Sequence, residues 1–311
     1  MLLGISDSDA PTVTERHWPG LRVSHARVVV PYDVATTSGT AGTRRRERFE
    51  AYRANAAAAG VELLVVFAPS ADLRAGPARA AVAPTADAYA ASVAAFLQRY
   101  PEQRTLAAWN EPNNRDARRY PLSGDPRLAA DYWLRLNELA GDGDGATVVA
   151  GGFAGIPGDD RYVHAYQRHL QKAHATPTVW AFHDHGDVNA FQEHGDTAAR
   201  IAREYLGALR GRWGEARIWI DEVGARYRDA RGVIWGDGSQ ARATQFLLSL
   251  ATLDQRIERI YYYNYSNQCA QPSRCAIQDR GLVSPNPFDG EPPDYDAADR
   301  RRAAYDVIAG R

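Results

Sequence analysis

Two glutamates in this chain each close a short apolar segment, and their types and placement indicate paired acid–base chemistry. Glu111 lies in the segment WNEPN (109–113), and Glu222 lies in the segment WIDEVG (219–224). Two facing carboxyl groups can divide two tasks, because one can protonate a departing oxygen while the other attacks a carbon or activates water. Cleavage of a glycosidic bond needs this division. Each glutamate also has a structural alternative, in which Glu111 caps a helix beginning at Pro112 and Glu222 pairs with an arginine.

The rest of the chain must bring these two segments together, and its pattern indicates how. Eight short runs rich in Val, Ile, Leu, Tyr and Trp recur with little alternation, which is typical of strands covered on both faces. Amphipathic or alanine-rich stretches separate them. The predicted strands span residues 2–6, 27–32, 62–67, 105–110, 147–152, 178–183, 217–222 and 259–264. The predicted helices span residues 43–59, 85–100, 126–140, 161–174, 197–212, 239–256 and 296–309.

This alternation predicts an α/β protein, a (β/α)8 TIM barrel built as a single domain over residues 1–311. Gly60 predicts a helix end, and Gly124-Asp125-Pro126 predicts an N-cap followed by a first-turn proline. An open doubly wound sheet is the alternative. Such a sheet would carry a glycine-rich turn after its first strand, and residues 6–9 (SDSD) form no such turn.

The C-terminal ends of the strands form the active site of such a barrel, so Glu111 and Glu222 are expected to meet at its mouth. The Asn-Glu-Pro motif after the fourth strand, preceded by tryptophan and partnered by a glutamate after the seventh, resembles clan A of the glycoside hydrolases, the retaining (β/α)8 glycosidases. The resemblance covers the whole chain. It implies hydrolysis of glycosidic bonds in an oligo- or polysaccharide, and it implies neither a metal nor an organic cofactor.

The resemblance also implies roles for individual residues. Glu111 matches the general acid/base, and Glu222 matches the nucleophile. Asn110 matches the asparagine that hydrogen-bonds the sugar hydroxyl next to the reacting carbon. Because Asn110 and Glu111 are neighbours, both can face the cleft only if the strand kinks at its end.

Three further residues match clan positions less closely. His183, at the end of the sixth run, fits a residue that orients the nucleophile and contacts sugar. His185 stands where many relatives have tyrosine, so the usual hydroxyl contact to the nucleophile is missing. Arg27 is a candidate for the strand-two arginine that holds the nucleophile ionised, although its place early in its run leaves open a position at the barrel bottom.

Four other residues are candidates for contact with the substrate. Tyr32 and Asp33 follow the second strand, and Tyr265 follows the eighth, where the clan usually has a tryptophan beneath the sugar. Trp235, in the long segment after the seventh strand, is a candidate platform on which the apolar face of a sugar could stack. Ordinary packing inside the barrel is the alternative for each tyrosine.

Composition narrows the classes of partner. The chain has 37 Lys+Arg against 38 Asp+Glu, a net charge of −1, which argues against nucleic-acid binding. Its apolar runs fall well short of the roughly 18 residues that a membrane span needs. The partner that the resemblance implies is a carbohydrate substrate.

The two cysteines bear on the compartment. Cys269 and Cys275 lie close together, and a disulfide closing this small loop would indicate an oxidising, extracellular location. Met1 is followed directly by Leu2-Leu3-Gly4-Ile5, without a basic segment or a cleavage site. Secretion is favoured, and a cytoplasmic location stays open.

Two other functional classes remain. The departures at His185 and Tyr265 fit a carbohydrate-binding barrel that has lost turnover. His183, His185 and Asp187 have ligand-like spacing, which fits a metal-dependent hydrolase, but the ends of the first and fifth strands supply no histidine to complete such a site.

Overall fold

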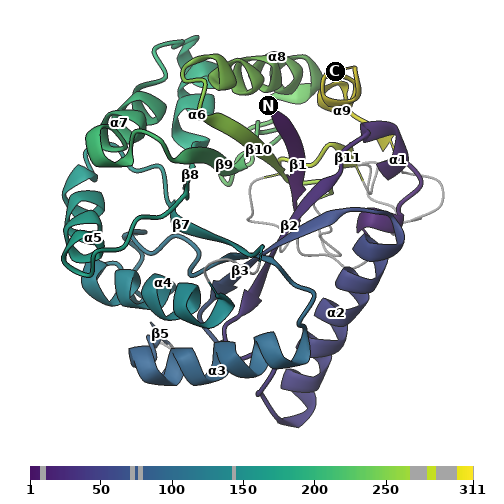
Figure 1. Cartoon of the computed structure of the whole chain (residues 1–311). Coiled ribbons are helices and arrows are strands. Elements are labelled where there is room, and N and C mark those ends of the chain that lie inside the picture. Colours follow the sequence, from purple (N-terminus) through teal and green to yellow (C-terminus); the bar gives the residue numbers. More distant parts are fainter. Residues whose placement is uncertain are drawn as a thin grey trace.

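Eight parallel strands close into a barrel around which the helices pack (Figure 1). The computed structural model describes residues 1–7, 12–70, 74–75, 80–141, 145–266, 279–284 and 300–310. The barrel strands are β1 (Leu2–Ser6), β2 (His25–Pro31), β3 (Glu62–Ala68), β6 (Thr105–Ala107), β7 (Thr147–Phe153), β8 (Val179–His183), β9 (Arg217–Val223) and β10 (Ile257–Tyr263). β1 pairs with both β2 and β10, so the sheet has no edge. The predicted (β/α)8 barrel is confirmed, and the open sheet is excluded.

Helices connect successive strands, and most lie where the sequence predicts them. They are α1 (Trp18–Leu21), α2 (Gly39–Ala58), α3 (Ala86–Arg99), α4 (Pro126–Ala140), α5 (Asp160–Lys172), α6 (His185–His194), α7 (Arg200–Ala208), α8 (Gly236–Ser249) and α9 (Ala303–Ala309). Short 3-10 turns follow α7 and α8 (Gly211–Trp213 and Leu250–Thr252), and another (Thr12–Thr14) precedes α1. Two small antiparallel pairs, β4 (Arg74–Ala75) with β5 (Ala80–Ala81) and β11 (Val283–Ser284) with β12 (Arg300–Arg301), lie outside the barrel sheet.

Two elements differ from the sequence-based prediction. Helix α6 was not expected, because its residues are largely polar and lack an apolar period; it begins directly after β8, where the Asp184 carboxylate accepts a hydrogen bond from the Asp187 backbone N–H at 3.3 Å. The expected helix 296–309 begins only at Ala303, because Arg300 and Arg301 form strand β12; residues 296–299 lie outside the described ranges.

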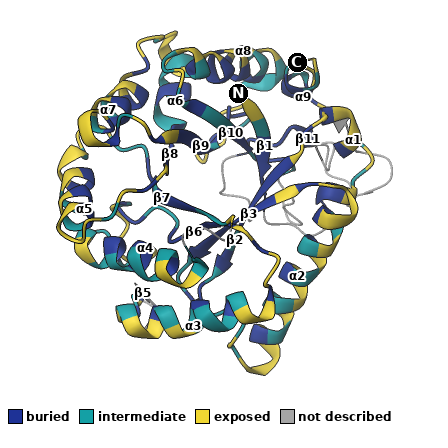
Figure 2. Ribbon diagram, viewed as in Figure 1, coloured by how far each residue is buried: buried dark blue, intermediate teal, exposed yellow. Residues whose placement is uncertain are grey.

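Apolar side chains fill both sides of the sheet. Figure 2 shows the barrel strands largely buried and the outer faces of the helices exposed. Inside the barrel lie Leu64, Val66, Ala107, Val149, Val179, Ala181, Trp219 and Tyr261. Between sheet and helices, the rings of Tyr89 on α3 and Tyr132 on α4 stack with centroids 4.2 Å apart. The Tyr89 hydroxyl donates to the backbone oxygen of Ala108 at 2.9 Å, which ties this aromatic layer to the chain just before Glu111.

The helix ends confirm two local predictions. Gly60 has φ +67°, the left-handed conformation that glycine adopts just beyond a helix. The Asp125 side chain accepts a hydrogen bond from the Leu128 backbone N–H at 2.9 Å, and Pro126 occupies the first turn of α4.

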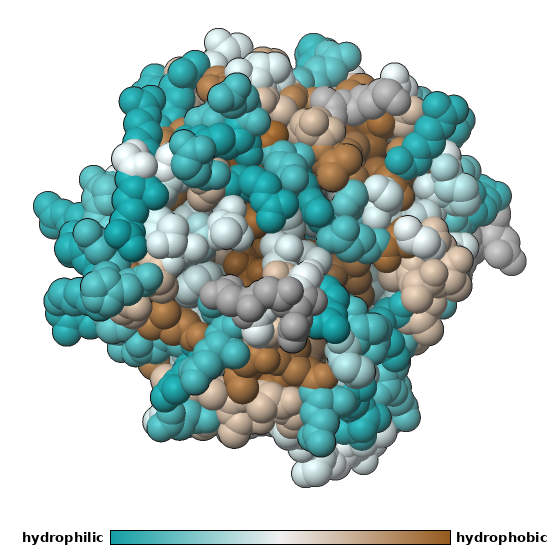
Figure 3. Space-filling model, viewed as in Figure 1, coloured by the Kyte–Doolittle hydropathy of each residue, from teal (hydrophilic) through white to brown (hydrophobic). Residues whose placement is uncertain are grey.

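Mostly hydrophilic side chains ring the face seen in Figure 3. Among the helices of the described ranges, none has the length and apolar character needed to cross a bilayer.

Replacing Asp125→Ala should lower the free energy of unfolding by about 1 kcal/mol, because the α4 cap bond to Leu128 is lost. Denaturant unfolding monitored by circular dichroism measures this change. Ser38→Ala is the matched control: Ser38 is the N-cap of α2, but its side chain makes no cap hydrogen bond. The control should stay within about 0.5 kcal/mol of wild type. Equal losses in the two variants would contradict the cap assignment.

Candidate active site

A buried arginine at the C-terminal end of the barrel collects side chains from several strands. The Arg27 guanidinium donates to Ser6 Oγ at 2.9 Å, to Asn110 Oδ1 at 2.6 Å and to Glu222 Oε2 at 2.6 Å. Its Nε donates to Asp221 Oδ2 at 3.3 Å. The strand stagger explains this reach, since Arg27 pairs in register with Ser6, the last residue of β1. Arg27 therefore lies at the mouth of the barrel and not at its bottom.

Glu222 and its neighbour Asp221 both face Arg27, although adjacent residues of a regular strand point to opposite faces. A β-bulge resolves this conflict: Phe182 pairs with Ile220 and His183 pairs with Glu222, so Asp221 is the extra residue on β9. Two residues further on, a side chain at Gly224 would collide with the backbone oxygen of Tyr263. Glycine thus permits the close approach of β9 to β10 next to Glu222.

Asn110 and Glu111 both enter the network because the backbone turns sharply at Glu111. Glu111 has φ +48°, which is unusual for a residue with a side chain. This turn supplies the predicted kink at the strand end. The Glu111 backbone N–H donates to the Gly152 oxygen at 2.9 Å, and Asn113 Oδ1 accepts from the Ala154 N–H at 2.7 Å, so the turn is fixed to the end of β7.

The two histidines divide between the two glutamates. His183 Nδ1 lies 2.9 Å from Glu111 Oε1, and His185 Nε2 lies 3.4 Å from Glu222 Oε1. His183 is fully buried, and His185 is half-buried as the first residue of α6. Asn114 Nδ2 donates to the other Glu111 oxygen at 2.7 Å.

The charges around each glutamate set its protonation. Burial by itself would raise the pKa of Glu222, but the Arg27 guanidinium and the two imidazoles outweigh burial and hold this pKa below its ordinary range. Burial also opposes ionisation of Glu111, yet the hydrogen bond and charge of His183 lower the Glu111 pKa, while the Glu222 charge acts in the opposite direction. Both carboxyl groups are therefore ionised in this resting arrangement.

The pKa values of the two histidines shift in opposite directions. Burial lowers the pKa of His183, but the charges of Glu222, Asp221 and Glu111 outweigh it, and the net shift is upward. Burial and the nearby Arg280 lower the pKa of His185 below 6.5, despite the contact with Glu222. His183 therefore favours the charged form and His185 the neutral one.

The two tyrosines proposed as sugar contacts are both buried. Tyr265 is buried against Trp18, with ring centroids 5.8 Å apart, and Tyr32 is buried between Tyr89 and Trp109, at 6.1 and 6.0 Å. Both pack in the core, which is the alternative that the sequence left open for each tyrosine. Tyr263, the last residue of β10, instead reaches the site: its ring centroid is 5.9 Å from that of His185. Burial, followed by the Glu222 charge, raises the pKa of Tyr263 to about 12.

Asp33, Trp235 and the cysteines remain predictions. The Asp33 backbone oxygen accepts from the hydroxyls of Thr36 and Thr37, which forms the turn after β2. Trp235 is half-buried, with the Arg226 guanidinium 5.1 Å above its ring. Cys269 and Cys275 lie outside the described residues.

Sequence reasoning also missed three residues that contact or flank the glutamates: Asp221, Asn114 and Tyr120. Burial and the adjacent Glu111 raise the pKa of Tyr120. A signal was present for Asp221, because two adjacent acids end one apolar strand. Asn114 and Tyr120 lie in the irregular segment after β6, where no period marks which residues turn inward.

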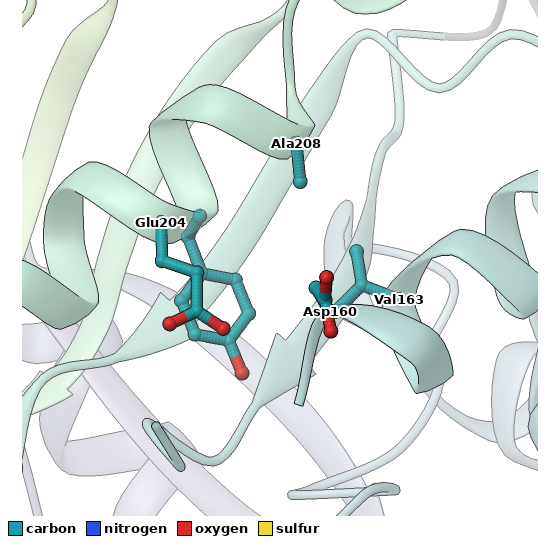
Figure 4. A pocket seen from close by; sticks show the side chains of 5 residues that line it. Asp160, Val163, Glu204 and Ala208 are labelled. Carbon is teal, nitrogen blue, oxygen red and sulfur yellow. The ribbon is translucent and has the colours of Figure 1, made fainter. Parts of the chain in front are cut away.

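Two hollows of the described structure lie away from this network. One of about 10 Å³ is lined by Asp160 and Val163 of α5 and by Glu204, Tyr205 and Ala208 of α7 (Figure 4). It is too small for a sugar ring. Another, of about 210 Å³, lies at the start of β3 and β6, beside Glu62 and Thr105, and so at the opposite end of the barrel.

His183, His185 and Asp187, whose spacing resembles a set of metal ligands, contact other groups of the protein. The Asp187 carboxylate oxygens accept from the backbone N–H groups of Ile201 and Ala202, at 3.2 and 2.9 Å, at the start of α7. Across the described ranges, no group of three or more His, Cys, Asp or Glu side chains is arranged to hold a metal ion.

Replacing Arg27→Met should lower the free energy of unfolding at pH 7 by about 3–5 kcal/mol, because Asp221 and Glu222 would stay buried without their cation. The depressed pKa of Glu222 stabilises the fold above the ordinary carboxyl range, and this contribution is lost as the pH falls. The difference from wild type should therefore shrink below about pH 4.5. Urea unfolding at pH 7 and pH 4 measures both effects.

Arg135→Met is the control for this prediction. Arg135 pairs with Asp87 and Glu138 on the surface, and its loss should cost about 0–1 kcal/mol. A loss at Arg27 no greater than the loss at Arg135 would show that the buried network contributes little.

Comparison with solved structures places this barrel among known folds. Xylanase B from Clostridium stercorarium F9 superposes with a TM-score of 0.65 at 12% identity, covering 100% of this chain and 97% of that one. A monomeric beta-xylosidase from Caulobacter crescentus CB15 gives 0.63 at 14% identity, covering 99% of this chain and 66% of that one, so the chain spans about two thirds of the xylosidase. A GH128 (subgroup I) endo-beta-1,3-glucanase from Amycolatopsis mediterranei gives 0.52 at 13% identity, covering 99% and 98%.

Comparisons of the sequence with protein-family models and with curated proteins gave no match. The structural likeness, at these identities, establishes the fold. The chain has the (β/α)8 barrel that the xylanase, the xylosidase and the glucanase share.

Proposed function

We propose that this protein is a retaining glycoside hydrolase, with Glu222 as the nucleophile and Glu111 as the general acid/base. One observation carries the proposal: two glutamates from the ends of β6 and β9 join a single buried network through Arg27 and His183. A glycosidase needs one carboxylate that stays ionised and a second that can exchange a proton. The shared fold with the xylanase and the glucanase adds support.

In the first half of the reaction, Glu222 attacks the anomeric carbon as the bond to the leaving oxygen breaks. Arg27 keeps Glu222 ionised for this attack. Glu111 is ionised before substrate binds, so it first takes up a proton and then gives that proton to the departing oxygen. Asn110, held by Arg27, is placed to accept or donate a hydrogen bond at the neighbouring sugar hydroxyl.

In the second half, water attacks the glycosyl–Glu222 ester and Glu111 takes a proton from it. The ester carries no charge, so the charge of Glu222 no longer raises the pKa of Glu111. Glu111 then stays ionised and suits the role of base. Loss of the Glu222 charge thus favours the ionised form of Glu111 that this half of the reaction needs.

The substrate we propose is an oligo- or polysaccharide. The similar structures are named as a xylanase, a xylosidase and an endo-beta-1,3-glucanase, so xylan and β-1,3-glucan are the first substrates to test. A reducing-sugar assay beside calorimetry tests activity and binding together. Binding without product release would favour the non-catalytic binding barrel, for which the histidine at position 185 is the specific observation.

Replacing Glu222→Ala should lower kcat by more than roughly 10³-fold, because the nucleophile is lost. Added azide should restore turnover and give a glycosyl azide of inverted configuration, identified by NMR. Glu204→Ala is the control, since this glutamate lies on the outer wall between α5 and α7. No azide product from the variant, with an active wild type, would overturn the nucleophile assignment.

Replacing Glu111→Gln should slow hydrolysis of a natural oligosaccharide far more than hydrolysis of an aryl glycoside with a dinitrophenolate leaving group. The aryl group departs without protonation, so glycosylation no longer needs the acid. Steady-state kinetics on the two substrates measures the ratio. An equal slowing of both would show that Glu111 does not act as the acid.

A further inference from the structure

His183 lies between two carboxyl groups, and the mechanism above gives it no step of its own. Its Nδ1 faces Glu111 Oε1 at 2.9 Å, and its Nε2 faces Asp221 Oδ1 at 3.5 Å. Both His183 and Asp221 are fully buried. An imidazole in this position can hold a proton on either nitrogen and can exchange the Nδ1 proton with the facing carboxylate.

The surrounding charges decide how many protons this imidazole holds. The titratable and charged groups that face it come from two strands, one loop and one helix: Arg27 on β2, Glu111 after β6, Asp221 and Glu222 on β9, and His185 on α6. Arg27 Nη2 lies 3.3 Å from Nε2 and would favour an unprotonated Nε2. Three carboxylates stand against this one guanidinium, and their excess negative charge favours the imidazolium.

We propose that Asp221, His183 and Glu111 form a proton relay in which His183 stores the proton that Glu111 delivers to the leaving group. Asp221 is a positioning residue: its Oδ1, a buried oxygen with no hydrogen-bond partner in the described part of the chain, lies 3.5 Å from Nε2, so its charge favours a proton on Nε2 and keeps Nδ1 directed at Glu111. This inference rests on the proposed function and extends it. It assigns to His183 a contact with the acid/base, whereas the sequence predicted a contact with the nucleophile.

The relay balances without any further reactant. When substrate is bound, the His183 Nδ1–H bond breaks and a Glu111 O–H bond forms, which leaves a neutral imidazole that keeps Nε2–H towards Asp221. Glu111 then passes this proton to the departing oxygen as the glycosidic bond breaks. In the second half, the water proton goes to Glu111 and returns to Nδ1, and the imidazolium is restored.

The pKa values of His183 and Glu111 shift in opposite directions, and this supports the storage of a proton on His183. The three carboxylates raise the pKa of His183 despite its burial, and the His183 hydrogen bond lowers that of Glu111. The pair loses its stored proton only as the pH rises above the ordinary histidine range, so the alkaline limb of the activity profile should report the pair and not Glu111 alone.

The first test needs no activity. In protein labelled with 15N-histidine, two-bond 1H–15N spectra should show both His183 nitrogens protonated at pH 7. Glu111→Gln should lower the pH at which His183 titrates, because one facing carboxylate is removed. Glu62→Gln is the matched control, since Glu62 lies 3.4 Å from His25 Nε2 at the other end of the barrel; it should leave His183 unchanged. A neutral His183 at pH 7, or a titration indifferent to Glu111→Gln, would overturn the relay.

The second test uses the pH dependence of kcat/KM on an oligosaccharide. His183→Gln keeps a side-chain donor near Glu111 but cannot store a proton, so the alkaline limb should move to lower pH. Asp221→Asn should move it in the same direction by a smaller amount. A limb that stays in place in His183→Gln would also overturn the relay. If the wild type hydrolyses no glycan, the proposed function fails, and the NMR titration still decides whether the pair shares its proton.

Discussion

One buried cation, Arg27, is the constraint on which the site depends. An unpaired charge in a protein interior is strongly destabilising, so every donor of this guanidinium must find an acceptor. The acceptors come from β1, from the turn after β6 and from β9, which are distant in sequence and meet only when the barrel closes. The site is therefore assembled only when the sheet closes. The Arg27 charge that organises the site also holds its strands together.

The fold could be predicted largely from local patterns. The β1 and α4 ranges agree to the residue with those expected from the sequence, because one is an apolar run and the other is framed by an N-cap and a proline. Helix α6 could not be foreseen, since its stability derives from its position after β8 and not from an apolar period. The barrel could be predicted from the count of eight apolar runs, because this count does not depend on the exact strand boundaries.

The site was predictable only in part. Glu111 and Glu222 could be identified because each is an acid that follows an apolar run at a strand end. The residues that contact them could not, because those contacts depend on the stagger of the strands and on the path of the backbone. The register between β1 and β2 brings Arg27 to the mouth, and a bulge turns Asp221 inward beside its neighbour. Tyr263 and Tyr265 differ by two residues, and only the course of the chain beyond β10 determines which ring meets His185 and which meets Trp18.

The tight contact at Gly224 limits how the Arg27 network can change during evolution. A methyl group there has no space against the Tyr263 carbonyl, so substitution would force the seventh and eighth barrel strands apart beside Glu222. The spacing of β9 and β10 beside Glu222 thus cannot change gradually through this position. Sequence change can instead accumulate in the segments that follow β6 and β9, such as residues 112–125 and 225–235, which lie outside the strands.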